Sequence, residues 1–484
     1  MSQQRIALKN VCLFVMIGYI AAAVLFWCVA KEQLHFRTST SAMLSPLQTV
    51  GEITEDSMIE QDVSIDEDEV LSVAFQVATY ARDYNQGVLR VDLMEDDTVL
   101  GSAYRDVSEL QDNHIENFSF DSPIDVRGKH LKLRLTSNSK SGYGVTVMYG
   151  NAIDTIKGSV THEIAQDQVA HVNGESIDGR LCFQVTTRSA LWYGSYYGLF
   201  VLAIGIALAG YLLYMLWCER TNRMCAGIKL LSVAQRYWFL LQQLVSRDFK
   251  NKYKRSVLGV LWSFLNPLLT MLVQYFVFSN IFKSDTENFV VYLLTGIVFF
   301  NFFSESSNMA MSSIVGNSAL ITKVYVPKYI YPLSRVLSSG VNFMISLLPL
   351  AMVMLITRVQ ITPAIILIVY PIVCTFFFSL GIGLILASIM VFFRDTQFIY
   401  GVLLTALMYL TPIFYPISII PERFQWLFQL NPICNNIVFA RSCIIDGVFP
   451  GMHLAVLCGA FALVSMLAGV CIFKKTQDRF ILNI

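Results

Sequence analysis

Basic and aromatic side chains alternate over residues 235–256, and their spacing suits the binding of phosphate at a membrane surface. Clustered Lys and Arg side chains form charge-assisted hydrogen bonds with phosphate oxygens. The candidate residues for such a site are Arg247, Lys250, Lys252, Tyr253, Lys254 and Arg255. A simpler explanation is also open, because Lys and Arg accumulate on the cytoplasmic side of membrane proteins. Both interpretations predict an amphipathic helix at the cytoplasmic face of a bilayer.

Glu305 is a carboxylate inside a predicted membrane span, where charge is costly and normally faces a cavity or a partner. We expect it to line a conduit together with aromatic side chains, whose faces suit sugar rings. The conduit candidates are Phe299, Phe300, Phe302, Phe303, Glu305, Tyr331, Tyr409, Phe414 and Tyr415. The alternative is a hydrated Glu305 near the cytoplasmic end of its span, with the aromatic residues in the core or facing lipid.

The elements that must position these side chains are apolar segments. Hydrophobic residues make up 55% of the 484 residues and charged residues 14%, against about 25% charged in soluble domains. Runs of about 20 apolar residues predict eight spans, over residues 11–30, 191–218, 257–282, 289–311, 333–356, 364–393, 398–417 and 454–473. The first run exceeds the apolar core of a signal peptide, so we expect a retained anchor.

The charge distribution predicts the orientation of these spans. Residues 31–190 hold 13 Lys and Arg against 26 Asp and Glu, a net charge of −13, whereas the remainder holds 22 against 9, a net charge of +13. The basic clusters all fall on one side of the membrane if the spans alternate. We therefore expect a multi-pass protein with both termini cytoplasmic and residues 31–190 extracytoplasmic.

Residues 31–190 are predicted to be all-β. Apolar and polar residues alternate over 70–79, 88–93, 131–135 and 145–149, with turn-forming stretches between them. Short strands at this spacing predict a β-sandwich, similar to jelly-roll, galactose-binding-like modules. Cys182 is the one cysteine in this region, so no disulfide can form inside it.

The predicted organisation therefore has five parts along the chain. They are a cytoplasmic N-terminus with the first span (1–30), the β-sandwich (31–190), the second span (191–218), a cytoplasmic amphipathic helix (219–256) and a six-helix bundle (257–484).

Motifs for catalysis and metal binding are missing from the sequence. It has no Gly-x4-Gly-Lys-Ser/Thr phosphate loop, so ATP hydrolysis by the usual means is not expected. The six histidines are scattered without metal-ligand spacing. We therefore expect no catalytic residues, no metal and no cofactor on this chain.

Three stretches of the membrane half occur in the order found in a known family. They are the basic segment 248–268, the segment 317–332 with its prolines, and the segment 410–441 with its Thr-Pro, Tyr-Pro and Asn-Pro pairs. Together they resemble the permease subunit of ABC-type polysaccharide exporters (the Wzm/TagG group), which moves O-antigens and wall teichoic acids. Typical members begin near the basic helix, so the resemblance leaves the anchor and the β-region unexplained.

The resemblance implies a homodimer in the bacterial cytoplasmic membrane, with two copies of a separate ATPase that binds ATP and Mg. The cations of 247–255 would then hold the diphosphate of a polyprenyl-linked glycan. A coupling helix over 319–331 would contact the ATPase through Leu320, Ile321, Lys323, Val324, Tyr325, Pro327 and Lys328. Membrane lipid is a further expected partner, and nucleic acid is not.

Several alternatives stay open. The exported polymer could be wall teichoic acid, and the chain could instead be a membrane-embedded glycosyl- or acyltransferase with an outer β-domain. A sensor that binds wall glycan is a third class, although about ten residues follow the last span. Cys434 and Cys443 could form a disulfide or remain free thiols.

Overall fold

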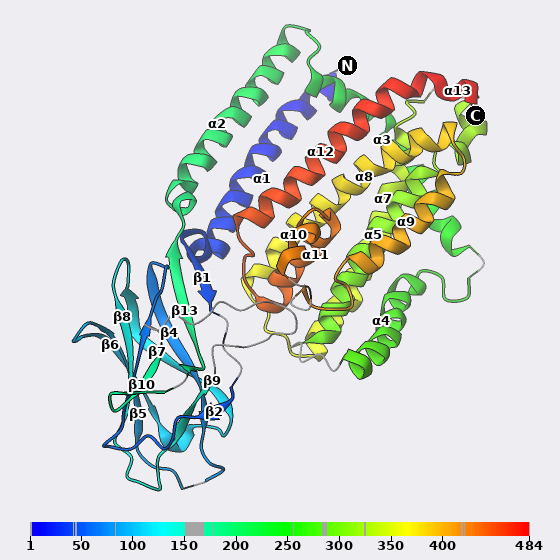
Figure 1. Cartoon of the computed structure of the whole chain (residues 1–484). Coiled ribbons are helices and arrows are strands. Elements are labelled where there is room, and N and C mark those ends of the chain that lie inside the picture. The colour runs from blue at the N-terminus through cyan, green and yellow to red at the C-terminus, as the bar shows by residue number, and fades with distance from the viewer. Residues whose placement is uncertain are drawn as a thin grey trace. The chain divides into compact units, whose positions relative to one another are not determined.

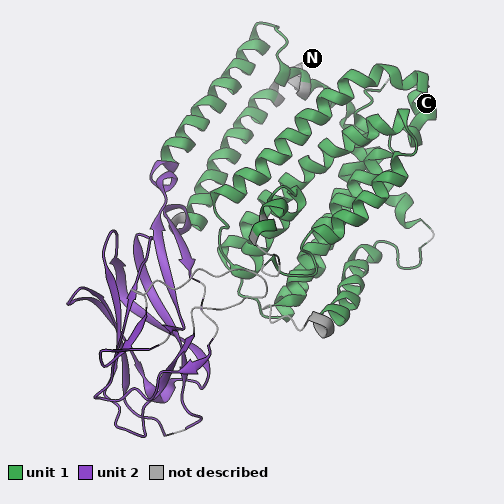
Figure 2. Cartoon of the chain, viewed as in Figure 1, with its two compact units in different colours: residues 1–31, 198–484 green, residues 32–197 purple. Residues whose placement is uncertain are grey.

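The computed structural model describes residues 2–41, 43, 46–82, 84–150, 169–177, 179–254, 256–282, 288–323, 326–417, 420 and 422–483. These residues form two compact units (Figure 2). The first unit combines residues 1–31 with 198–484 and is helical, whereas the second, residues 32–197, is built mainly from β-strands.

Seven helical segments in the described part of the chain are long and apolar enough to cross a membrane (Figure 1). They lie in α1 (Ser2–His35), α2 (Trp192–Arg220), α4 (Leu261–Phe282), α5 (Phe289–Met311), α7 (Ile330–Ile356), η4 (Pro363–Ile368) with α8 (Val369–Phe392), and α12 (Met452–Thr476) with η7 (Gln477–Arg479) and α13 (Phe480–Asn483). The chain is therefore a multi-pass membrane protein. The other helices are η1 (Val107–Glu109), α3 (Ala226–Tyr253), η3 (Val315–Asn317), α6 (Ser318–Ile321), α9 (Thr396–Leu410), α10 (Glu422–Gln429), α11 (Pro432–Arg441) and the π-turn η6 (Ser442–Asp446).

The eighth predicted span, over residues 398–417, is not confirmed. The helix found there, α9, has 15 residues, about 22 Å at 1.5 Å per residue, which is short of a hydrocarbon core of about 30 Å. It ends at Leu410 because Pro412 has no amide hydrogen to donate and its ring disfavours helical geometry at Thr411.

Helices α5, α7 and α8 form the centre of the helical unit (Figure 1), and α5 is largely buried. Helices α8 and α12 approach each other closely at two glycines. A Cβ atom on Gly381 would lie 2.4 Å from the backbone of Ser465, and one on Gly469 would lie 2.4 Å from the carbonyl oxygen of Gly381. Any larger residue at either position would force the two helices apart.

Helices α1 and α2 pack against each other through a small apolar cluster that includes Leu8, Cys12, Leu212 and Met215. The Tyr19 hydroxyl also donates to the carbonyl of Val201 at 2.6 Å. This contact joins the two helices that precede and follow the β-unit in the chain.

The second unit has two antiparallel sheets. The seven-stranded sheet contains β1 (Phe36–Thr40), β2 (Gln48–Thr49), β4 (Glu69–Ala78), β7 (His114–Asp125), β9 (Thr146–Gly150), β12 (Arg180–Leu181) and β13 (Phe183–Ala190). The six-stranded sheet contains β3 (Met58–Val63), β5 (Val88–Glu95), β6 (Thr98–Asp106), β8 (Leu131–Ser137), β10 (Ala170–Val172) and β11 (Glu175–Ser176). Strands β4, β5, β8 and β9 occupy the four stretches where alternation predicts strands, so the β-rich character of the region is confirmed.

One hydrophobic core draws residues from both sheets. The Phe75 ring lies at its centre, 6.1 Å from the Phe118 ring and 5.9 Å from the Phe183 ring, and all three side chains are buried. Alternation along the strands supplies these inward positions. Cys182 is the one cysteine of residues 31–190, so this core has no internal disulfide.

The first and last strands of the unit are neighbours. Strand β1 pairs with β13 from Phe36 opposite Ala190 to Thr40 opposite Thr186. The amide of Leu191 donates to the carbonyl of His35 at 2.8 Å, so the pairing continues to the end of α1.

Glu52 joins three loops at one end of the unit. Its carboxylate accepts hydrogen bonds from the amides of Gly142 (3.0 Å) and Gly144 (2.9 Å) and from the guanidinium of Arg82 (3.0 Å). Burial opposes the charge on Glu52, but the hydrogen bonds from these two amides and from Arg82 outweigh it and lower the pKa of the carboxyl group.

A lowered folded-state pKa makes this junction sensitive to acid. The stabilisation is fully present above the unfolded-state pKa of Glu52 and is lost as the pH falls through the lower folded-state value. We expect the amides of Gly142 and Gly144 to lose protection from hydrogen exchange below about pH 4.5, after correction for intrinsic rates. In Glu52→Gln the protection should be weaker already at pH 7 and should depend less on pH. Equal pH profiles in the two proteins would contradict this role.

Candidate functional site

Helix α3 (Ala226–Tyr253) is the predicted amphipathic helix. Its inner face, including Leu240 and Leu244, packs against the apolar cluster formed by α7 and α8, whereas Trp238 and Phe239 are exposed on other faces. This exposure of large aromatic side chains on a basic helix is typical of a helix at a membrane interface. The helix ends at Tyr253, with Lys250 and Lys252 in its last turn, where cations interact favourably with the helix dipole.

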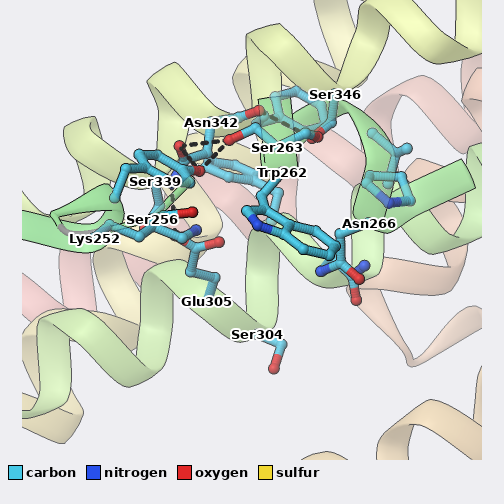
Figure 3. Close-up of a pocket in the computed structure, with 16 residues that line it drawn as sticks. Lys252, Ser256, Trp262, Ser263, Asn266, Ser304, Glu305, Ser339, Asn342 and Ser346 are labelled. Atoms are coloured by element: carbon cyan, nitrogen blue, oxygen red, sulfur yellow. Dashed lines mark hydrogen bonds and ion pairs between the residues drawn. The ribbon is translucent and has the colours of Figure 1, made fainter. Parts of the chain in front are cut away.

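A polar cavity of about 640 Å³ lies between the end of α3 and helices α4, α5 and α7 (Figure 3). Its wall combines hydroxyl, amide and charged groups with a few aromatic rings. They include Lys252, Ser256, Trp262, Ser263, Asn266, Asn301, Phe302, Glu305 and Asn342. A polar cavity inside a bundle of apolar helices is the arrangement expected of a passage for a polar solute, since polar side chains in spans normally face a cavity or a partner.

Glu305 connects three of these elements. Its Oε1 accepts a hydrogen bond from Lys252 Nζ at 2.7 Å and another from Asn342 Nδ2 at 2.9 Å, and Figure 3 shows Lys252 and Glu305 pointing toward each other. Asn342 Oδ1 in turn accepts from Tyr253 at 3.0 Å and from Ser263 at 3.3 Å, and these two hydroxyls also contact each other. The network therefore ties α3 and α4 to α5 and α7.

The predicted cationic residues fall into two groups in the structure, those in ion pairs and those without one among the described residues. Lys252 is paired with Glu305, and Arg247 is paired with its neighbour Asp248. Lys250 and Lys254 are exposed and form no ion pair with another described residue. Arg255 lies outside the described residues. Lys250 and Lys254 are consequently the cations of this group that are available to an anionic ligand without breaking an existing pair.

Asp248 is a buried carboxylate one turn before Lys252. Its Oδ1 accepts from Arg247 at 3.0 Å, and its Oδ2 lies 3.3 Å from Nε of Arg335 on α7. Arg247 also donates to Asn317 Oδ1 at 3.1 Å, and Asn317 Nδ2 donates to the carbonyl of Ser313 at 2.7 Å. The cluster thus connects α3 to α7 and to the segment that contains η3 and α6.

The four predicted phenylalanines of α5 are all buried, and Phe302 alone lines the polar cavity. Phe302 stacks on Phe343 at 4.6 Å, whereas Phe299 meets the same ring edge-on at 5.3 Å. Phe303 stacks on Phe378 of α8 at 5.4 Å. Phe299, Phe300 and Phe303 therefore act in this structure as packing residues between helices.

The remaining aromatic candidates lie elsewhere. Tyr331 is buried in the apolar cluster of α7 and α8, away from the lining of the cavity. Tyr409 is exposed on α9, while Phe414 stacks on Phe278 at 5.0 Å. The Tyr415 hydroxyl donates to the carbonyl of Tyr409 at 2.9 Å, which closes the turn after α9.

Arg441 organises this turn, a role that its sequence position did not indicate. Its guanidinium is buried, lies 3.3 Å from the centroid of the Tyr292 ring, and donates to the carbonyls of Tyr292, Pro412 and Ile413 at 2.6 to 3.2 Å. The sequence does contain a signal for this role, since Arg441 lies between the apolar residues 437–440 and 443–445. An arginine in such surroundings is expected to be buried, and a buried cation requires several hydrogen-bond acceptors. Cys434 and Cys443 nearby are buried free thiols.

The predicted coupling helix over 319–331 is wrong in extent. Helix α6 ends at Ile321 and α7 begins at Ile330, so Tyr331 belongs to α7. Pro327 lacks an amide hydrogen and disfavours helical geometry at Val326. Of the coupling candidates, Leu320 and Ile321 lie on α6, and Lys323, Pro327 and Lys328 lie in the connection. Lys328 donates to the carbonyl of Gln477 at 2.5 Å. Val324 and Tyr325 lie outside the described residues.

The Asp248 cluster yields a stability prediction. Asp248→Ala removes the carboxylate that accepts hydrogen bonds from Arg247 and forms an ion pair with Arg335, so we expect the free energy of unfolding to fall by about 1–3 kcal/mol. Unfolding of the detergent-solubilised chain in increasing dodecyl sulfate, followed by tryptophan fluorescence, measures this change. Asp395→Asn, at an exposed aspartate, serves as control and should shift the value by less than about 0.5 kcal/mol. Equal midpoints for the two variants would mean that the Asp248 contacts contribute nothing.

Comparison with known proteins places this site in a family. The model of the ABC-2 type transporter family matches residues 240–435, which include the end of α3 and the walls of the cavity. An O-antigen export system permease protein of Klebsiella pneumoniae is 30% identical over 50% of this chain and 93% of its own length. The corresponding protein of Myxococcus xanthus is 32% identical over 52% of this chain and 98% of its own.

A more distant relative is the polysialic acid transport protein of Escherichia coli, 25% identical over 50% of this chain and 95% of that protein. Relatives of this kind are named as permeases or transport proteins, which confirms the expectation of a transporter permease and not an enzyme. The family match begins at residue 240, so α1, the β-unit and α2 all lie before it. The chain belongs to the ABC-2 type transporter family, among the permeases of ABC-type polysaccharide export systems.

Proposed function

We propose that this chain is the transmembrane subunit of an exporter that moves a lipid-linked polysaccharide across the cytoplasmic membrane, driven by a separate ATPase. The observation that carries the proposal is the polar cavity beside the basic end of α3. Hydroxyl and amide groups such as those of Ser263, Asn266 and Asn301 can replace the water that hydrates a sugar. Trp262 and Phe302 offer apolar surface to the carbon-bearing face of the ring.

The cations at the end of α3 suit the lipid-linked end of such a polymer. Lys250 and Lys254 form no ion pair with another described residue, and each is two residues from Lys252 in the sequence at the end of α3. A polyprenyl diphosphate carries negative charge at the membrane surface, where ammonium groups bind phosphate through charge-assisted hydrogen bonds. The basic side of the bundle is then cytoplasmic, both termini lie on that side, and residues 31–190 are extracytoplasmic.

Movement of a partner ATPase would reach the cavity through the Asp248 cluster. The connection between α5 and α7 supplies the surface for the ATPase, and Asn317 in that connection contacts Arg247. Arg247 and Asp248 precede Lys252 by about one helical turn, so a displacement at Asn317 is passed along α3 to the Lys252–Glu305 pair. ATP and magnesium bind to the ATPase, and the functional assembly contains two copies of each chain.

Two observations favour this function over the alternatives. The relatives are named as export permeases, which disfavours a glycosyl- or acyltransferase. The acidic region 31–190, with a net charge of −13, would repel a polyanion such as wall teichoic acid. A neutral polysaccharide is therefore the better candidate.

The phosphate role is tested by Lys250→Gln with Lys254→Gln. These exposed lysines hold no structural ion pair with the described residues, so the variant should insert normally. Each charged hydrogen bond contributes about 1.5–3 kcal/mol, and we expect surface polysaccharide in a complemented deletion strain to fall about tenfold or more. Lys474→Gln with Lys475→Gln removes two exposed lysines from the end of α12 and should export normally. Normal export by the first variant would leave the lysines with a topological role only.

The coupling route is tested in the complex with the co-purified ATPase. The chain alone should hydrolyse no ATP, and turnover by a preparation free of the ATPase would contradict the proposal. Arg247→Ala and Asn317→Ala should each reduce polymer moved per ATP hydrolysed, and the double variant should be no worse than either single variant. This non-additivity follows because both substitutions break the same 3.1 Å contact. Additive losses would show that the two residues act independently.

A further inference from the structure

Three tyrosines gather on two loops of the β-unit, 79–87 and 138–145. Tyr80, Tyr84 and Tyr143 are 39%, 57% and 43% exposed. The rings of Tyr84 and Tyr143 meet edge-on at 5.8 Å, and the Arg82 guanidinium lies 4.7 Å from the centroid of the Tyr80 ring. We refer to Tyr80, Tyr84 and Tyr143 as the tyrosine cluster.

The backbone that presents this cluster is held in an unfavourable conformation. Tyr80 and Ala81 both have left-handed φ angles, of 58° and 53°, which cost on the order of 1–3 kcal/mol each when the residue is not glycine. Asp112 holds the loop by accepting from the amide and hydroxyl of Thr79 at 2.6 and 3.1 Å. The Asn85 amide donates to the carbonyl of Thr79 at 2.9 Å. These contacts hold the backbone that carries Tyr80.

Polar groups adjoin the cluster on one side. A cavity of about 410 Å³ lies beside Arg82 and is lined by Asn85, Ser108 and Asp112 among others. Asn85 is 4% exposed, and its Oδ1 accepts no hydrogen bond from another described residue. The Ser108 hydroxyl and the Asp112 carboxylate in the wall are on exposed residues, so a hydroxyl group that enters this cavity can hydrogen-bond with them.

We propose that the tyrosine cluster and this cavity form a binding site for a neutral polysaccharide. Exposed tyrosine rings pack against the carbon-bearing faces of sugars, while the groups of the cavity bind hydroxyls. The Arg82 guanidinium is neutralised by Glu52 at 3.0 Å, and the surrounding region has a net charge of −13, so a polyanion is repelled. The identity of the ligand as exported polymer rests on the proposed function.

Because the β-unit is joined to a membrane helix at each end, even a weak affinity for the polymer is sufficient for binding. Helices α1 and α2 hold it to the membrane at both ends, so the polymer that leaves the same assembly is present at a high effective concentration. A dissociation constant in the millimolar range is then sufficient for capture.

The test uses the full chain in lipid nanodiscs and the surface polysaccharide of the producing cells, released from its lipid by mild acid. We expect saturation-transfer NMR to detect binding, and Tyr84→Ala with Tyr143→Ala to raise the dissociation constant about tenfold or more, since packed aromatic anchors each contribute over about 1 kcal/mol. Tyr104→Ala is the control, because Tyr104 is 59% exposed on β6, outside the cluster. Polysialic acid, a polyanion, should not bind.

Equal affinity of the double variant and the wild type, absence of binding to the wild type, or equal binding of polysialic acid would each overturn the inference. Far-ultraviolet circular dichroism of both variants checks that the β-unit stays folded. Export is measured separately in cells. If the chain exports polysaccharide but does not bind it, only the proposed binding site is contradicted. If the chain exports no polysaccharide, the proposed function is contradicted.

Discussion

A carboxylate placed among membrane helices must have a partner, and Glu305 satisfies this requirement with groups from two other helices. Its oxygen accepts from Lys252 of α3 and from Asn342 of α7. The Lys252 and Glu305 side chains are 38% and 30% exposed, so the ion pair itself contributes modestly, and the end of α3 is held against α5 and α7 by the whole network around Asn342. The size and polarity of the cavity follow from that attachment, because the same side chains form its wall.

A second group of polar contacts, around Arg441, provides hydrogen-bond donors to backbone carbonyls that do not belong to a helix. Residues 411–416 follow α9 without forming a helix, and in an apolar bundle their carbonyls need donors. Arg441 supplies several donors to this turn from one guanidinium, and the Tyr292 hydroxyl donates to the carbonyls of Pro412 and Tyr415. The two polar clusters thus have different roles. One forms a cavity wall, and the other replaces missing helical hydrogen bonds.

The elements of the fold could be predicted because each depends on local periodicity. Alternation identified β4, β5, β8 and β9, and apolar length identified the long helices. The site could be predicted only in part. Sequence identified Lys252, Tyr253, Glu305 and Phe302. It did not identify Ser263 and Asn342, which meet Tyr253 through packing of helices that are far apart in the chain. Burial of Phe299, Phe300 and Phe303 also depends on neighbours that periodicity does not specify. The extent of the predicted coupling helix was wrong for a local reason, since Pro327 disfavours helical geometry at Val326.

The pairing of β1 with β13 has a consequence for the origin of the chain. Phe36 and Ala190 are opposite each other, so the polypeptide enters and leaves the β-unit at points about 5 Å apart. A domain whose ends are adjacent can be inserted into a host sequence, or removed from it, while the host keeps its own connection. Residues 36–190 therefore have the geometry of a transferable cassette placed within a helical hairpin of α1 and α2. Exchange of this cassette between relatives would replace the β-unit while the helical unit, which contains the family-matched residues 240–435, stays the same.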